Sequence, residues 1–219
     1  MNNFIVGFLS SLLATIVAAY TLVLLSEKFR WFLTGILGRL AHHDIEFVFP
    51  KKEACTDDLD KEFSKSSKIY VLTSRGNELK RDPFKKLINE KPSNRKLDLR
   101  IILPKVSQTG FDFINQREDE IKTFDKAYGN GRLKDDIKTN IDYLMHIFMN
   151  DQNCGIKLSL ANYPHFARII ITDDFLFLQP YNKNRHGEFD PVMKFRRGET
   201  YKAFARYFDL IWNSEKDEF

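Results

Sequence analysis

The sequence predicts an N-terminal transmembrane helix followed by one α/β domain whose mixed sheet carries helices on its faces. Two observations predict this fold class. The first 26 residues contain no charged side chain, and beyond them short apolar runs typical of strands alternate with segments of helical spacing. A chain of 219 residues leaves room for one such domain with a substantial core, and not for a second large one.

A membrane-spanning helix is predicted within residues 1–27. Residues 4–25 are mostly Leu, Ile, Val, Phe and Ala, and their number is close to the roughly 20 that cross hydrocarbon as a helix. Lys28, Arg30 and Arg39 follow this segment, whereas no lysine or arginine precedes it. The positive-inside rule therefore predicts a single-pass protein with its N-terminus outside and its large domain in the cytoplasm.

Small residues recur along one face of the predicted anchor, at Gly7, Ser11, Thr15 and Ala19. Such a face lets helices approach closely, which suits a homo-oligomeric bundle in the lipid bilayer, including one that lines a pore. The other interpretation is that small residues are simply common in membrane helices. Residues 28–43 alternate apolar and basic side chains, which predicts an interfacial helix after the anchor.

The α/β domain is predicted to occupy residues 44–219. Compact or alternating apolar runs predict strands at residues 45–49, 69–72, 97–104, 156–160, 167–172, 175–178 and 192–195. Asp173 and Asp174 predict a hairpin turn between two of these strands. Helical spacing and helix-start residues predict helices at residues 56–65, 113–128, 133–149 and 200–213, with one more beginning at Asp82-Pro83-Phe84.

Charge and cysteine content narrow the classes of function. The formal net charge is only +4, but residues 65–105 hold 12 Lys/Arg against 4 Asp/Glu. A local basic surface suits phosphates, anionic lipid or nucleic acid, although an ordinary solvated face has the same composition. Cys55 and Cys154 lie in no metal-ligand or redox spacing and make no disulfide framework, which indicates a reducing compartment.

Three polar clusters lie where α/β sheets place ligands, at strand ends and in the loops that follow them. The first is Thr73-Ser74-Arg75-Gly76, whose hydroxyls, cation and glycine suit either a phosphate cradle or a plain turn. The second, at residues 164–168, contains His165 and Arg168 and opens a strand. The third is a polar loop at residues 179–186, directly after a strand.

These clusters, in this order, resemble the phospholipase D-like family in one of its single-half forms. The resemblance covers residues 68–213, and includes His165 leading into a strand, an acidic turn, a further strand and a polar loop that contains asparagine. Active members use a His-x-Lys motif with a later Asp. Their imidazole attacks phosphorus, while a second subunit or half supplies the other histidine as general acid.

The sequence departs from that motif. Ala167, not lysine, stands two residues after His165, while the cation Arg168 and the acid Asp173 are each displaced by one place. A shift of one place along a strand turns a side chain to the opposite face, so His165 and Arg168 are expected to face opposite sides unless a bulge intervenes. The resemblance thus implies phosphate binding with hydrolysis lost.

Two alternatives stay open at this point. One is a membrane-bound phosphodiesterase acting on nucleic acid or phospholipid, with His165 as its catalytic residue in a dimeric site. The other is a membrane-tethered scaffold that recruits a protein partner. The sequence contains no phosphate-binding P-loop, dinucleotide fingerprint or nucleophile elbow, and we expect no cofactor and no metal.

A degenerate phosphodiesterase domain on an anchor is also similar in layout to the small inner-membrane effectors of bacterial anti-phage defence, of which the oligonucleotide-gated Hailong type comes closest. This similarity implies an antiviral effector whose domain senses a nucleotide or short oligonucleotide and controls an oligomeric transmembrane assembly, by forming an ion channel or disrupting the membrane. The side chains expected to bind the ligand are Ser74, Arg75, Lys80, His165, Arg168, Tyr181, Asn182, Asn184, Arg185 and His186.

Overall fold

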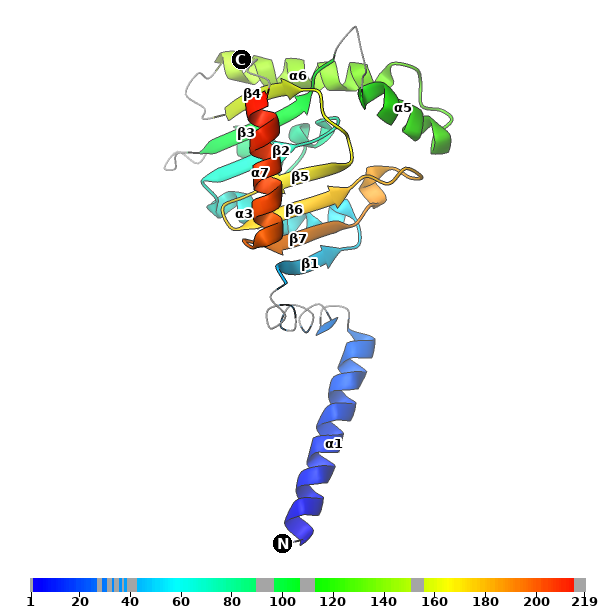
Figure 1. Ribbon diagram of the computed structural model, residues 1–219, viewed down its shortest axis with the longest axis vertical. Helices are drawn as coiled ribbons and strands as arrows, with labels where there is room; N and C mark the ends of the chain where they lie inside the picture. The colour runs from blue at the N-terminus through cyan, green and yellow to red at the C-terminus, as the bar shows by residue number, and fades with distance from the viewer. Residues whose placement is uncertain are drawn as a thin grey trace.

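The centre of the molecule is a seven-stranded mixed sheet with the order β1-β7-β6-β5-β2-β3-β4 (Figure 1). The computed structural model describes residues 2–26, 29, 30, 33, 36, 38, 43–89, 97–106, 113–150 and 156–214. The strands are β1 (Ile45–Phe49), β2 (Lys68–Leu72), β3 (Asp98–Pro104), β4 (Ile156–Ala161), β5 (Ala167–Ile171), β6 (Phe175–Pro180) and β7 (Val192–Arg196). The prediction of a mixed sheet with helices is confirmed, and a strand lies at each of the predicted places.

Helices flank this sheet and one helix precedes it. They are α1 (Asn2–Leu25), α3 (Thr56–Lys65), α4 (Phe84–Asn89), α5 (Phe113–Phe124), α6 (Arg132–Asn150), α7 (Glu199–Ser214) and the short 3-10 helices η1 (Lys52–Cys55), η2 (Asn77–Lys80) and η3 (Gly187–Phe189). The helix predicted at residues 113–128 ends early because a turn follows it, in which the Tyr128 N–H donates to the Asp125 carbonyl.

The predicted membrane anchor requires a correction. The segment is helical as α1, which Figure 1 shows apart from the sheet. Among the residues that the structure describes, however, no helix combines the length and the apolar character needed to cross a membrane. Within α1 the Thr15 and Thr21 hydroxyls donate to the Ser11 and Val17 carbonyls, one turn earlier.

This finding contradicts several predictions together. They are the transmembrane helix at residues 1–27, the single-pass inner-membrane location with the N-terminus outside, and the ion channel. Helix packing through Gly7, Ser11, Thr15 and Ala19 stays an untested prediction. The cytoplasmic location of the domain was inferred from the single-pass topology, so that prediction is contradicted as well. The interfacial helix predicted at residues 28–43 lies largely outside the described residues.

The sheet changes direction between its two halves. Strands β2, β3 and β4 are parallel, whereas β5 runs antiparallel to β2 and forms the predicted hairpin with β6. The hairpin closes where the Thr172 N–H donates to the Phe175 carbonyl at 2.8 Å. The register pairs Leu72 with Ile169 and Arg168 with Gln179. The end of β2, the start of β5 and the end of β6 therefore meet at one edge of the sheet.

Alternate strand residues form two cores, one on each face of the sheet. Val71, Ile101 and Ile170 belong to the core that includes the apolar faces of α3 and α4. Leu72 and Ile169 belong to the other core, which α7 covers with Tyr201, Phe208 and Trp212. Because Arg168 alternates with Ile169 along β5, it lies on the same face as Ile170. That face is where the candidate site forms.

Helices α5 and α6 pack against each other through a third cluster, which includes Ile114, Ile121 and Ile137. The Glu118 carboxylate fixes the connection between them, because it accepts the backbone N–H groups of Gly131 and Leu133 at 2.7 and 3.1 Å. This satisfies donors at the start of α6 that have no partner within the helix. The pairing holds α5 beside the polar edge of the sheet.

Candidate anion-binding site

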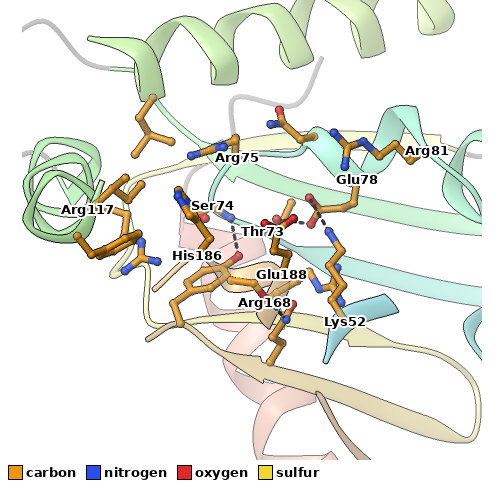
Figure 2. Close-up of a pocket in the computed structure, with 17 residues that line it drawn as sticks. Lys52, Thr73, Ser74, Arg75, Glu78, Arg81, Arg117, Arg168, His186 and Glu188 are labelled. Carbon is orange, nitrogen blue, oxygen red and sulfur yellow. Dashed lines mark hydrogen bonds and ion pairs between the residues drawn. The ribbon is translucent and has the colours of Figure 1, made fainter. Parts of the chain in front are cut away.

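A cavity of about 300 Å³ opens at this edge of the sheet (Figure 2). We call it the first cavity. Its walls are formed by residues from η1, the turn after β2, η2, α5, the start of α6, β5, the end of β6 and η3. The charged groups that line it are five Lys or Arg against two Glu, namely Lys52, Arg75, Arg81, Arg117, Arg168, Glu78 and Glu188. The excess of cations favours an anionic ligand.

Arg168 contributes the most deeply buried cation of this cavity. Its side chain enters from β5, and the residue is only 2% exposed. Within the described part of the chain, its Nη2 is buried with no hydrogen-bond partner. A buried donor without an acceptor costs about 1–3 kcal/mol, and more if charged. A ligand acceptor held within hydrogen-bond distance of Nη2 would remove that cost.

Glu78 supplies a buried countercharge from η2. Burial alone would raise the pKa of its carboxyl group, but the charges of Lys52 and Arg168 and a hydrogen bond from Thr73 lower that pKa to about 2. The Thr73 hydroxyl donates to Glu78 Oε1 at 2.6 Å, and Lys52 Nζ lies 3.9 Å from Oε2. The Tyr163 hydroxyl donates to the Thr73 carbonyl at 2.7 Å, which fixes the strand end that carries this contact.

Arg75 is held by the helix pair rather than projecting freely. Its Nη2 donates to the Tyr128 hydroxyl at 2.8 Å, and its Nε lies 3.6 Å from Asp136 Oδ2. The Asn140 amide donates to the Arg75 carbonyl at 2.8 Å. The chain then turns at Gly76, whose φ of 82° is a left-handed conformation that favours glycine. Arg75 is therefore fixed at the wall of the first cavity, with part of its charge already balanced.

Arg117 and Tyr181 form the wall on the side of α5. The Arg117 guanidinium lies over the Tyr181 ring, 5.1 Å from its centre, and Nη1 donates to Glu120 at 2.9 Å and to the Asn182 carbonyl at 3.3 Å. The Tyr181 hydroxyl accepts the backbone N–H of Ser74 at 3.3 Å. This contact joins the loop after β6 to the end of β2.

The loop after β6 is held by its own polar side chains. Gln179 Nε2 donates to the carbonyl groups of Gly187 and Asp190 at 2.6 and 3.2 Å. The Asp190 carboxylate accepts the Asn182 N–H at 3.0 Å and Arg185 Nε at 2.7 Å. Asn182 and Arg185, which were both predicted to bind the ligand, therefore help to shape the loop.

A smaller second cavity of about 210 Å³ adjoins the first. Arg117 and Tyr181 line both cavities. The remaining residues around the second cavity are Phe113, Gln116, Glu120, Pro164, His165, Phe166 and Lys183. It is therefore richer in aromatic side chains than the first cavity and shares one wall with it.

The residues predicted to bind a ligand divide into three groups. Those that line the first cavity are Ser74, Arg75, Arg168, Tyr181 and His186. His165 lines the second cavity instead. Of the described lining residues, none is Lys80, Asn182, Asn184 or Arg185. The Lys80 amine donates to the Thr139 carbonyl at 3.2 Å, and the backbone N–H of Asn184 donates to Asn182 Oδ1 at 2.8 Å.

The residues that resemble a phosphodiesterase motif are not brought together. His165 and Arg168 line different cavities, and only Arg168 lines the first. Asp173 follows β5 at the far end of the sheet, where its carboxylate accepts the backbone N–H and the hydroxyl of Ser67. In this arrangement the imidazole, the guanidinium and the carboxylate do not point at one common atom.

Several charged residues of the first cavity were not predicted from the sequence, among them Lys52, Glu78 and Arg117. Lys52 and Glu78 lie in short 3-10 helices, which have no apolar periodicity to mark them. Arg117 stands among charged residues of α5, a pattern typical of a solvated face, yet it is 6% exposed. No group of three or more His, Cys, Asp or Glu side chains within the described ranges is arranged to hold a metal ion.

Comparison with known proteins gives little further information. No family model matches the chain, and no curated protein matches it. Among solved structures, one that matches is TrmBL2, described as an archaeal chromatin protein with a novel mode of DNA binding. It is 13% identical with a TM-score of 0.44, and the match covers 96% of this chain but 65% of that one. A likeness at this level carries no argument about function.

Proposed function

We propose that the first cavity binds the phosphate groups of a nucleotide or short oligonucleotide, and that the protein is a ligand-binding protein rather than an enzyme. The observation that carries the proposal is Arg168, a cation that is 2% exposed, with a buried Nη2 that lacks an acceptor within the described residues. Arginine presents donors in a planar fork that matches phosphate oxygens. Four further cations line the same cavity.

The similarity to phospholipase D-like domains remains part of this proposal. The polar turn after β2, the residues that open β5 and the loop after β6 were the clusters that suggested it, and all three reach one edge of the sheet. Such an edge is where α/β sheets place ligands. The effector role in antiviral defence and the homo-oligomer were implied by a layout that includes a membrane anchor, so without that anchor they stay predictions that this proposal does not use.

Hydrolysis is the weaker candidate. A phosphodiesterase would need the His165 imidazole beside the phosphorus atom that the cations hold. His165 lines the second cavity, whereas Arg168 lines the first. The arrangement therefore supports binding better than turnover, and we expect the purified full-length chain to show no turnover of generic phosphodiesters.

The test is calorimetric titration of the purified full-length chain with adenosine 5′-diphosphate and with inorganic pyrophosphate. Replacing Arg168 with glutamine removes a charged donor, and we expect about 10-fold weaker binding or more, since hydrogen bonds to charged groups contribute about 1.5–3 kcal/mol. Arg206→Gln is the matched control, because Arg206 is exposed on α7, which covers the other face of the sheet.

Two results would overturn the proposal. The first is equal affinity of the Arg168→Gln and Arg206→Gln variants for both probes. The second is a wild-type chain that binds neither probe at low ionic strength, where electrostatic attraction is strongest. Far-UV circular dichroism of each variant separates a lost contact from a lost fold.

A further inference from the structure

The second cavity has the chemistry of a ring-binding site. Three of its lining residues, Phe113, Phe166 and Tyr181, are aromatic. Phe166 is 45% exposed, and its ring meets Tyr207 edge-on at 5.6 Å. Such exposure leaves part of the Phe166 ring available for a flat ligand group.

The position of these rings is set by the backbone at the edge of the sheet. The Tyr181 N–H donates to the Phe166 carbonyl at 2.8 Å, so the pairing of β5 and β6 extends past the regular strands and holds both residues in place. Phe113 approaches from the first turn of α5. The rings are thus carried by three different segments, and two of those segments are tied together.

Polar groups of the second cavity complement its aromatic walls. Gln116 offers both amide donors and a carbonyl acceptor, and Lys183 offers an ammonium group. A nucleobase presents two flat faces for stacking and an edge of donors and acceptors. Stacking on aromatic side chains accepts every base, because each base has a π face.

The shared wall links the two cavities. Arg117 and Tyr181 line both, and the Arg117 guanidinium lies over the Tyr181 ring. These two residues have a cationic cavity on one side and an aromatic cavity on the other. A nucleotide has the same order of groups, with phosphate joined to a ring through a sugar.

We infer that a single ligand occupies both cavities, with its phosphate in the first, its nucleobase in the second and Phe166 as a stacking residue. This inference rests on the proposed function and deepens it. It predicts that the ligand is a nucleotide or the terminal unit of an oligonucleotide. It also predicts that inorganic phosphates and sugar phosphates bind more weakly.

The test compares ligands that differ only in the base. The full-length chain is titrated with adenosine 5′-monophosphate, uridine 5′-monophosphate and ribose 5-phosphate. We expect both nucleotides to bind roughly 5- to 150-fold more tightly than the sugar phosphate, which is the range that base stacking on an aromatic side chain supplies. Phe166→Ala should remove that advantage and leave the affinity for ribose 5-phosphate unchanged.

Phe189→Ala is the matched control. Phe189 is also a surface phenylalanine, 54% exposed, and it is not among the described residues that line either cavity. This variant should retain the wild-type preference for nucleotides.

Each outcome has a distinct meaning. Equal wild-type affinities for ribose 5-phosphate and the nucleotides would overturn the inference while leaving phosphate binding intact. If Phe166→Ala kept the wild-type preference for nucleotides over ribose 5-phosphate, the inference would also be overturned and phosphate binding would remain intact. Failure of all three ligands to bind would instead reject the proposed function, and the inference with it.

Discussion

At the scale of single residues, the Glu78 carboxylate lowers the net positive charge of the first cavity. Its carboxyl group is buried, and its pKa of about 2 keeps it ionised at neutral pH, so it balances part of the charge of Lys52 and Arg168. An unbalanced cluster of buried cations would be costly to form. Glu78 therefore lets the protein hold Arg168 in a buried position before any ligand is present.

This role predicts a pH dependence of stability. The pKa of Glu78 in the folded state, about 2, lies below the ordinary value of 4.5. Its contribution to the free energy of unfolding is therefore present above about pH 4.5 and is lost as the pH falls through the folded value. The loss amounts to about 3 kcal/mol in total, because one pKa unit corresponds to about 1.4 kcal/mol. Glu78→Gln should therefore be less stable than wild type at pH 7.

The same variant should lose less stability on acidification. Between pH 6 and pH 3 we expect its free energy of unfolding, measured by urea titration, to fall by about 2 kcal/mol less than that of wild type. Glu188→Gln, an exposed side chain of the same cavity, is the charge-matched control. Parallel pH curves for wild type and Glu78→Gln would show that Glu78 has no such role.

The residues predicted to bind a ligand that do line the first cavity lie mainly at polar strand ends, whereas cavity residues marked only by their burial were not predicted. Ser74, Arg75 and Arg168 were found because each lies beside an apolar run that marks a strand. Asn182 and Arg185 belong to an equally polar stretch, but they bond to Asp190 within their own loop. The pattern of a loop alone does not distinguish residues that face a ligand from residues that shape the loop.

At the scale of elements, the turn between β2 and η2 orients the first cavity. Gly76 has a φ of 82°, and a Cβ atom there would lie 3.0 Å from Leu103 Cδ2 and 3.4 Å from Asn140 Cβ. The turn stands between Arg75 and Glu78, which both line the cavity. A distortion at this single position would therefore displace a cation and an anion of the site together.

Gly76→Ala is predicted to destabilise the fold by about 1–2 kcal/mol, because an L side chain in the left-handed region is strained and the site has little space. Gly129→Ala is the control, since a Cβ at Gly129 meets nothing within 4 Å. Chemical denaturation of both variants measures the difference. If the two alanine variants were equally stable, the turn would be able to relax and the argument from its conformation would be wrong.

Elements were predicted well where a long periodic pattern exists. The helix expected at residues 56–65 has those bounds in the structure, and the helices near the C-terminus differ by one residue at each end. The 3-10 helices η1, η2 and η3 were not predicted, because three or four residues are too few for periodicity to appear. Strand order was not predicted either, since local patterns do not specify which strands pair.

At the scale of the whole molecule, the site depends on segments that are distant in sequence. Lys52 and Glu188 line the same cavity, and between them the chain contributes residues from β5 and α5. The cavity therefore exists only when β2, β5 and β6 are assembled in one sheet and α5 is docked beside them. A ligand that binds there binds the folded state and not the unfolded chain.

Ligand binding should therefore raise the thermal stability of the full-length chain. At a nucleotide concentration 100 times the dissociation constant, binding to the folded state adds about 2.7 kcal/mol to the free energy of unfolding. For a chain of this size, this corresponds to a rise of roughly 5–10 °C in the melting midpoint. Differential scanning fluorimetry with increasing adenosine 5′-diphosphate measures it. The rise should shrink as salt is added, because the cavity attracts its ligand through charge.

The variants decide whether the rise comes from the first cavity. Arg168→Gln should show a much smaller shift than wild type at the same nucleotide concentration, and Arg206→Gln should show the wild-type shift. A full shift in Arg168→Gln would mean that the nucleotide binds elsewhere on the folded chain. No shift in wild type at concentrations that saturate the calorimetric titration would mean that the ligand binds the unfolded chain equally well. Neither result is compatible with a site built from the assembled sheet.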